Sequence, residues 1–269
     1  MNLEIQPGPP SGKRGHIGTS AVVNGFTILE LLVVVAISSM LLAILLPSIQ
    51  HTRQIGKRIR CQANLKQIAS AWHEYLDAHD GCFLQGINTN INYGGQQGAV
   101  PSFQGDKPLN EFLGAPAKAQ ADLEVFHCPA DEGSRQIQPT FFGHYGTSYM
   151  TNLMLVGQNR LRYAPFDPCK DVFKKINDRL PQLNRTSLAN ESKLILLGDA
   201  GWLNSWNWQD SNRVEWHGEP CGHNLAFMDG HVEFIRIHKG AHTTSQYTVV
   251  PFKNLQVVAW DCQKEMDGD

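Results

Sequence analysis

The longest apolar stretch of the chain runs from Phe26 to Leu46 and contains a single charged side chain, that of Glu30. As a helix it spans about 31 Å at ~1.5 Å per residue, close to the ~30 Å hydrocarbon core of a bilayer. A buried core helix rarely runs so long without polar residues. A cleaved secretory signal usually has a shorter apolar region, followed by a small-residue cleavage site. The pattern therefore predicts a retained transmembrane helix over residues 26–46.

A different pattern follows the apolar stretch. Apolar positions recur with a period near 3.6 residues at Ile55, Ile59, Leu65, Ile68, Ala69, Trp72 and Leu76. This spacing predicts an amphipathic helix over residues 47–80, stopped by Asp80-Gly81. Pro47 is expected to kink the helix or to begin a new one, with Ser48 as its cap. The apolar stripe needs a surface to pack on, most simply a globular head built from the rest of the chain.

The remaining residues, 81–269, predict a head in which short strands alternate with long loops. Lys193–Leu197 is an apolar run that ends at a Gly-Asp pair, which is typical of a strand. Leu225–Met228 and His231–Ile237 flank Asp229-Gly230 and predict a β-hairpin with a tight type I′ turn. The expected fold class is α+β, with a long N-terminal helix packed on a C-terminal antiparallel sheet.

Composition excludes some classes and leaves the disulfides open. The net charge is −2 and no long basic run occurs, so a nucleic acid partner is not expected, because phosphate binding needs a concentrated basic face. The six cysteines form no CxxC pair, which disfavours a zinc ribbon; they are Cys61, Cys82, Cys128, Cys169, Cys221 and Cys262. Three disulfides, one disulfide or only buried thiols are all compatible with this spacing.

Glu30 is the one acid within the predicted membrane helix. A carboxylate at membrane depth is costly unless it is paired. A cut between Gly25 and Phe26 would place a new α-amino group about one helical turn from Glu30, so the two charges could neutralise each other within a chain or between chains. The alternative is that Glu30 lies near the interface and snorkels to water.

The segment from Gly25 through Phe26 to Glu30, followed by an apolar run, resembles the prepilin motif of type IV pilins and type II secretion pseudopilins. The resemblance implies that a prepilin peptidase cuts after Gly25 and methylates the amine of Phe26. It also implies that Glu30 guides docking between pilin-like subunits. Pro47 matches a proline that many pilins carry. Residues 1–25 are then the leader, and the partners are the peptidase, other subunits and inner-membrane lipid.

The chain beyond the membrane resembles a pilin-like family with a C-terminal His/Asp-Gly signature. Residues 61–75 are similar to that family's post-membrane helix, and residues 148–152 to its Ser-Tyr-x-x-Asn segment. Cys128, Pro129 and Asp131 match its Cys-Pro-x-Asp segment and are interpreted as structural, as is Gly230. The signature places nine residues between His and Asp-Gly, whereas 11 lie between His217 and Asp229 here, and His223 is a poorer match.

Three residues of this C-terminal segment are candidate metal ligands, namely His217, Asp229 and His231. The divalent metal could be zinc, or calcium held by Asp199 or by loop carbonyls. The alternative is that Asp229 only forms the turn and the histidines lie on strand faces. No catalytic residue is predicted, since the chain has no G-x-S-x-G elbow and no Gly-rich phosphate loop. Four tryptophans form either a binding surface or a small core under a loop, namely Trp202, Trp206, Trp208 and Trp216.

These features predict a structural filament subunit rather than an enzyme. It would be a single-pass inner-membrane protein with a cytoplasmic leader and a periplasmic C-terminal domain. Charge alone indicates the opposite topology, because two basic residues precede the apolar run and five follow closely, Arg53, Lys57, Arg58, Arg60 and Lys66. Two rival functions are a membrane-tethered extracytoplasmic enzyme that uses the His/Asp residues, and a minor tip or adhesion module that binds glycan or protein through the tryptophans.

Overall fold

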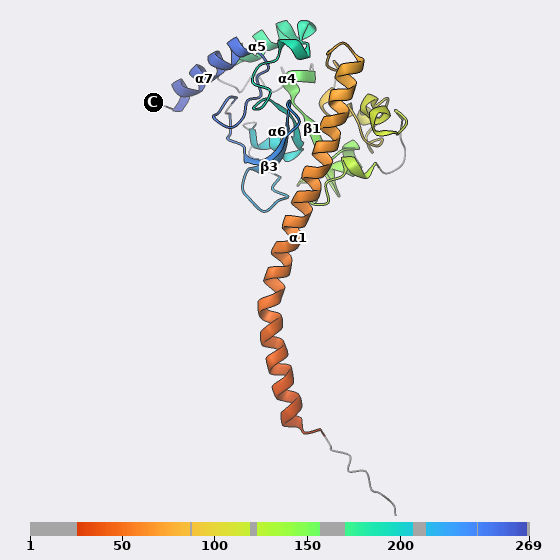
Figure 1. Cartoon of the computed structure of the whole chain (residues 1–269), viewed down its shortest axis with the longest axis vertical. Coiled ribbons are helices and arrows are strands. Elements are labelled where there is room, and N and C mark those ends of the chain that lie inside the picture. The colour runs from red at the N-terminus through yellow and green to blue at the C-terminus, as the bar shows by residue number, and fades with distance from the viewer. Residues whose placement is uncertain are drawn as a thin grey trace, which may run out of the picture. The chain divides into compact units, whose positions relative to one another are not determined.

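The structure of the chain is a computed structural model that describes residues 26–86, 88–118, 123–156, 170–206, 214–240 and 242–267. The chain divides into two compact units, one that reaches to Ser48 and one that begins at Ile49. The first unit holds the N-terminal part of helix α1, and the second holds the rest of α1 with the head (Figure 1).

Helix α1 is formed by Ile28–Ala78 and begins at a capping box. The Oγ1 atom of Thr27 accepts a hydrogen bond from the backbone N–H of Glu30 at 3.2 Å. In return, Oε2 of Glu30 accepts one from the backbone N–H of Thr27 at 2.9 Å. The helix is followed by Asp80 and Gly81, whose φ angles of 53° and 77° are left-handed and cannot continue it. The predicted helix and its stop are therefore confirmed, and Pro47 lies inside the helix without starting a new one.

The part of α1 in the first unit carries a continuous apolar surface. Its large apolar side chains have exposed fractions between 47% for Val33 and 84% for Ile28. Among the residues that the structure describes, α1 is the one helix long and apolar enough to cross a bilayer. This fits a single-pass membrane anchor, and a signal sequence would meet the same criteria.

The part of α1 in the second unit buries one face in the core of the head. Its buried residues are Cys61, Asn64, Leu65, Ile68, Ala69, Ala71, Trp72, Tyr75 and Leu76. The ring of Trp72 is fully buried and stacks on Tyr93, with ring centroids 5.8 Å apart. The predicted stripe is confirmed from Leu65 to Leu76, whereas Ile59 before it remains 59% exposed.

The head contains one antiparallel sheet of four strands in the order β1-β2-β3-β4. The strands are β1 (Tyr149–Thr151), β2 (Ile195–Asp199), β3 (Gly222–Phe227) and β4 (Val232–Arg236). The predicted α+β class is confirmed, as are the run that becomes β2 and the hairpin of β3 and β4. Strand β3 begins at Gly222, earlier than the apolar pattern indicated.

The turn of this hairpin differs from the predicted type I′. The backbone N–H of Gly230 donates to the carbonyl of Phe227 at 2.9 Å, so the turn begins at Phe227. A turn with Asp229 and Gly230 as its two central residues would begin one residue later. Gly230 has a φ of 86°, whereas Asp229 is not among the residues with positive φ. A type I′ turn needs positive φ at both central residues. The loop is instead a type I turn that ends in a left-handed glycine.

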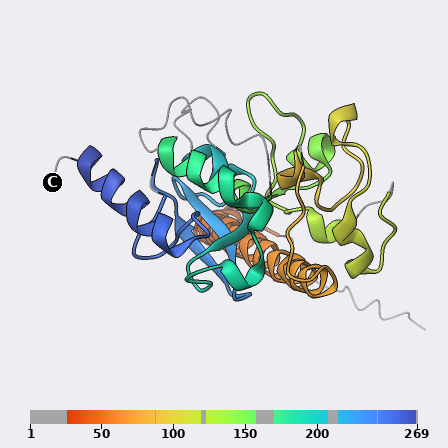
Figure 2. The ribbon, with the colours of Figure 1, turned by 90° about the horizontal axis from the view of Figure 1, so that it is seen from above.

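Helices cover both faces of the sheet (Figure 2). On one face, Nδ2 of Asn64 in α1 donates to the hydroxyl of Tyr149 in β1 at 3.2 Å. On the other face, Oγ of Ser205 in α6 (Gly201–Trp206) lies 2.8 Å from Nε2 of His223 in β3. Side chains alternate between the two faces along each strand. Residues next to Tyr149 on the α1 face therefore lie between the sheet and α1.

The other elements surround this layer. In the described part of the chain the other α-helices are α2 (Thr89–Asn92), α3 (Phe141–Tyr145), α4 (Leu153–Val156), α5 (Lys170–Arg179) and α7 (Lys253–Asp267). Short 3-10 segments cover Pro101–Phe103, Pro108–Leu113, Glu124–Phe126, Leu180–Gln182 and Arg185–Ser187. Helices α5 and α7 lie side by side at the C-terminal side of the head (Figure 2).

Three of the four tryptophans belong to the packed interior. Trp202 is fully buried and its Nε1–H donates to the carbonyl of Met150 at 3.1 Å, while Trp206 is 5% exposed. The Nε1–H of the half-buried Trp216 donates to the carbonyl of Gly133 at 3.1 Å. These three side chains fit the core interpretation. Trp208 lies outside the described residues.

Candidate functional site

A buried polar cluster lies between the sheet and α1, at the end of β2. The backbone pairing of Gly198 with Leu225 places Asp199 beside Asn224 on adjacent strands. The Oδ2 atom of Asp199 accepts hydrogen bonds from the backbone N–H and the Nδ2 group of Asn224, at 2.8 and 3.2 Å. Because Asp199 is 1% exposed and Asn224 is fully buried, these bonds compensate for part of the loss of water.

His217 comes to this cluster from the loop that precedes β3. Its Nε2 lies 3.0 Å from Oδ2 of Asp199, and each side chain is 1% exposed. The same nitrogen lies 2.9 Å from Nδ2 of Asn224. The amide nitrogen of Asn224 can donate a hydrogen bond but cannot accept one. A proton on Nε2 of His217 therefore has the Asp199 carboxylate, and not Asn224, as its acceptor.

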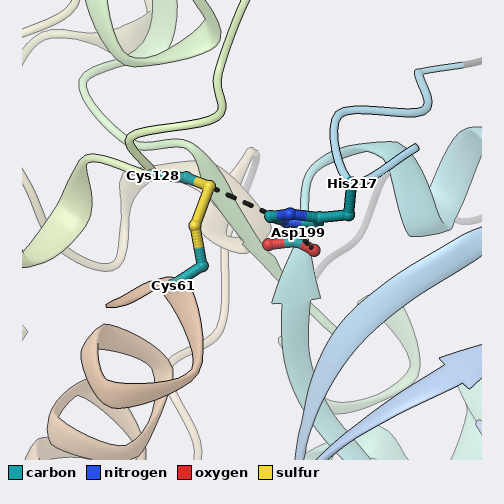
Figure 3. A group of neighbouring side chains, drawn as sticks. All are labelled: Cys61, Cys128, Asp199 and His217. Carbon is teal, nitrogen blue, oxygen red and sulfur yellow. Dashed lines mark hydrogen bonds and ion pairs between the residues drawn. A yellow bond between two sulfur atoms is a disulfide. The ribbon is translucent and has the colours of Figure 1, made fainter. Parts of the chain in front are cut away.

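A disulfide closes the other side of the cluster. Cys61 of α1 is bonded to Cys128 of the loop before β1, and Sγ of Cys128 lies 3.8 Å from Nε2 of His217 (Figure 3). One helix, one strand and two loops therefore meet at four side chains. This resolves one of the open disulfide pairings, while Cys82 and Cys221 are free thiols.

Several atoms of the cluster that can form hydrogen bonds have no bonding partner in the described part of the chain. Three of its side-chain atoms are buried without a partner among the described residues, namely Oδ1 of Asp199, Nδ1 of His217 and Oδ1 of Asn224. A buried polar atom without a partner costs about 1–3 kcal/mol. Three such atoms in one place carry a cost that a water molecule or a bound ion would remove.

The predicted metal ligands do not form one site. Asp229 and His231 pair with each other in the exposed hairpin turn, with Nδ1 of His231 2.6 Å from Oδ1 of Asp229. His217 instead contacts Asn224, which lies near the start of strand β3, whereas the turn follows the end of that strand. Within the described ranges, the group of possible ligands that includes His217 contains Cys61, Cys128 and Asp199.

Asp131 of the Cys-Pro-x-Asp segment organises the loop that carries Cys128. Its two carboxylate oxygens accept four hydrogen bonds, from the backbone N–H groups of Gly133, Phe141 and Phe142 and from the hydroxyl of Ser148. The hydroxyl oxygen of Ser148 in turn accepts from the backbone N–H of Cys128 at 3.1 Å. The two family-like segments are thus hydrogen-bonded to each other, and they fix Cys128 beside the cluster.

The predicted processing residues lie in and before the first unit. Gly25 lies outside the described residues. Phe26 is 74% exposed, and Glu30 is occupied by its two hydrogen bonds to Thr27. Glu30 therefore has a local role at the start of α1 in addition to the docking role that the prepilin resemblance implies.

His223, the poorer match to the family signature, lies on the opposite face of the sheet from Asn224. The pKa of His223 is lowered from 6.5 to about 4, chiefly by burial; Asp199 acts to raise this pKa and His217 acts to lower it. In the unfolded chain the His223 imidazole is protonated below about pH 6.5, whereas in the folded chain it is protonated only below about pH 4. We therefore expect stability to be complete above pH 6.5 and to fall by about 3 kcal/mol as the pH drops to 4.

This expectation is measured by chemical denaturation of the detergent-solubilised full chain between pH 4 and 8. His223→Gln is the matched variant, because its amide can still bond to Ser205 but does not titrate in this range. Below pH 6.5 the free energy of unfolding of the parent protein should fall relative to that of the variant. A constant difference across this range would show that His223 does not resist protonation.

Comparison with known proteins gives a family match. Residues 50–168 match a family model described as SBP_bac_10, protein of unknown function (DUF1559), a family typically associated with pilin-like, prepilin-type proteins. This span is similar to a pilin-like family. The match contains Cys61 and Cys128 and ends before Asp199 and His217. No curated protein and no solved structure matches the chain.

Proposed function

We propose that the chain is a structural subunit of a pilin-like filament of the type II secretion or type IV pilus class. The observation that carries this proposal is the contrast along α1. Its N-terminal part exposes almost every apolar side chain, whereas its C-terminal part is built into the core of the head. The pilin-like family match over residues 50–168 supports the same class.

The exposed part of α1 needs an apolar environment. Soluble monomers rarely expose contiguous apolar patches larger than a few hundred Å², and here the patch surrounds the helix on all sides from Ile28 to Leu46. A helix that is apolar all round fits either a bilayer or a bundle of like helices. A filament subunit uses both in turn: lipid during storage in the inner membrane, and neighbouring copies after assembly.

Glu30 supplies the polar contact in this apolar surface. Cleavage after Gly25 would leave a methylated, positively charged amine on Phe26, and this amine can pair with Glu30 of a neighbouring copy. The pair would set the axial position of one helix against the next, because an unpaired charge at this depth is costly. Maturation requires the leader on the cytoplasmic side with the peptidase, and the head then lies in the periplasm.

The proposed role is structural rather than catalytic. His217 and Asp199 are side chains of catalytic type, but each is 1% exposed, and the nearest cysteine sulfur is already bonded to Cys61. A cysteine-based mechanism would need a free thiol beside the imidazole, and the disulfide leaves none there. The buried cluster is therefore better suited to holding α1, β2 and two loops together.

The experiment that tests the proposal is the mass and N-terminal sequence of the chain taken from native membranes. The expected chain begins at N-methylated Phe26. Gly25→Leu is the matched control, since it alters the residue before the cut and leaves the apolar helix unchanged; this variant should keep residues 1–25.

A further inference from the structure

We propose that Cys61, Cys128, Asp199 and His217 bind one Zn²⁺ ion when the Cys61–Cys128 disulfide is reduced. The four residues would then be two thiolates, one imidazole and one carboxylate, a ligand set that zinc accepts in tetrahedral sites. The inference concerns the head and is independent of the filament proposal.

The donor atoms already lie at distances close to those of a zinc site. All four lie within 4.8 Å of one another, and all four residues are buried. The separations are 3.0 Å between Oδ2 of Asp199 and Nε2 of His217, and 3.8 Å between that nitrogen and Sγ of Cys128. Ligands bonded to one zinc at ~2.0–2.3 Å lie about 3.3–3.8 Å apart in a tetrahedron. Opening the disulfide allows the two sulfurs to separate to such a distance by side-chain rotation.

The unpaired atoms of the cluster point to a cation. Asp199 keeps a buried carboxylate oxygen without a partner, and so does the Asn224 amide oxygen next to it. A metal ion satisfies the carboxylate through a bond stronger than a hydrogen bond. The two N–H groups of Asn224 would remain on Asp199 and orient it, as second partners of metal ligands commonly do.

The chemistry is balanced with a phosphine or a dithiol as reductant. The reductant supplies two electrons, the S–S bond breaks, and two thiols form while the phosphine becomes its oxide with one water, or the dithiol its cyclic disulfide. Zinc then displaces the protons of the two thiols, which go to solvent. The proton on Nε2 of His217 moves to Nδ1, which has no partner among the described residues.

A cleft lies beside His217. It has a volume of about 190 Å³ and is lined by His51, Gln54, Ile55, Arg58, His217, Gly218 and Glu219. Arg58 and Glu219 form an ion pair of 3.2 Å at this cleft, with the Glu219 side chain 63% exposed. In the proposal, the ion reaches the buried side chains from this cleft. In the oxidised protein both sulfurs are used by the disulfide, so only two ligands remain and binding should be weak.

The test uses the full chain in detergent with the other four cysteines changed to serine, so that Cys61 and Cys128 are the only thiols. After reduction with a phosphine, Zn²⁺ alone is titrated in competition with a chelator, and Co²⁺ is used as a spectroscopic probe. The expected result is one zinc per chain, two protons released per zinc, and a thiolate-to-cobalt charge-transfer band. The oxidised protein should show none of these.

Variants separate this site from adventitious binding. His217→Ala should remove stoichiometric binding, and Asn224→Ala should weaken it by about 10- to 100-fold. His231→Ala is the matched control and should bind like the parent, because His231 lies in the exposed turn. The proposal is overturned if the reduced parent, shown to be folded, binds no zinc or shows no sulfur-to-cobalt band. It is also overturned if His217→Ala, shown to be folded, binds as tightly as the parent.

Discussion

Replacing Glu30 by glutamine is expected to reduce incorporation into filaments by about 100-fold while leaving the chain in the membrane. Glutamine can still accept the hydrogen bond from the backbone N–H of Thr27 that begins α1. The charge, however, is lost, so the amine of Phe26 on the neighbouring copy would be left unpaired at membrane depth. That costs about 2.5–3.5 kcal/mol for a cation at the centre of a helix, and 1.4 kcal/mol is a factor of ten.

The measurement is the amount of mature chain in the sheared filament fraction relative to the membrane fraction. Glu30→Leu should be equally defective, and it additionally loses the capping box. Ser39→Ala is the matched control, since Ser39 is an exposed residue of the same apolar segment and its hydroxyl donates to the carbonyl of Val35. Wild-type amounts of Glu30→Gln in filaments would assign Glu30 a role at the helix start alone.

The second large effect is expected from the disulfide. Changing both Cys61 and Cys128 to serine should lower the free energy of unfolding of the oxidised protein by about 4 kcal/mol, because the bond closes a loop with a sequence separation of 67 residues. The bond also clamps α1 to the loop that carries Asp131, so its loss should loosen the contact of α1 with the head.

Chemical denaturation of the detergent-solubilised full chain measures this effect. Cys82→Ser is the control, because Cys82 is an exposed free thiol and its replacement should change stability by less than about 0.5 kcal/mol. If the double variant were as stable as this control, the disulfide would make no net contribution to the fold.

The sequence was sufficient to predict the elements whose signal is local. The 3.6-residue period over Leu65–Leu76 and the Asp80-Gly81 stop located the end of α1, and the apolar runs located β2 and the hairpin. The turn type was missed because Asp-Gly can occupy two positions in a hairpin loop. The pairing of Ala226 with Val232 decides between them, and that register depends on packing rather than on the turn residues.

The candidate site could not be assembled from spacing. Cys61, Cys128, Asp199 and His217 are far apart in the sequence, and the packing of α1 and two loops against the end of β2 brings them together. The predicted set of His217, Asp229 and His231 relied on nearness in sequence, whereas the strand between them separates His217 from the turn. One signal was available: Cys61 lies four residues before Leu65 on the buried stripe, which indicates a cysteine facing the core.

The filament proposal is tested most directly by the intact mass and N-terminal sequence of the chain from native membranes, in cells with an active prepilin peptidase. The proposal predicts a chain that begins at Phe26 with a methylated amine, which would establish both the processing and the cytoplasmic position of the leader. A chain that retains residues 1–25 in those cells would contradict the filament role and would favour a tethered protein that acts through its head.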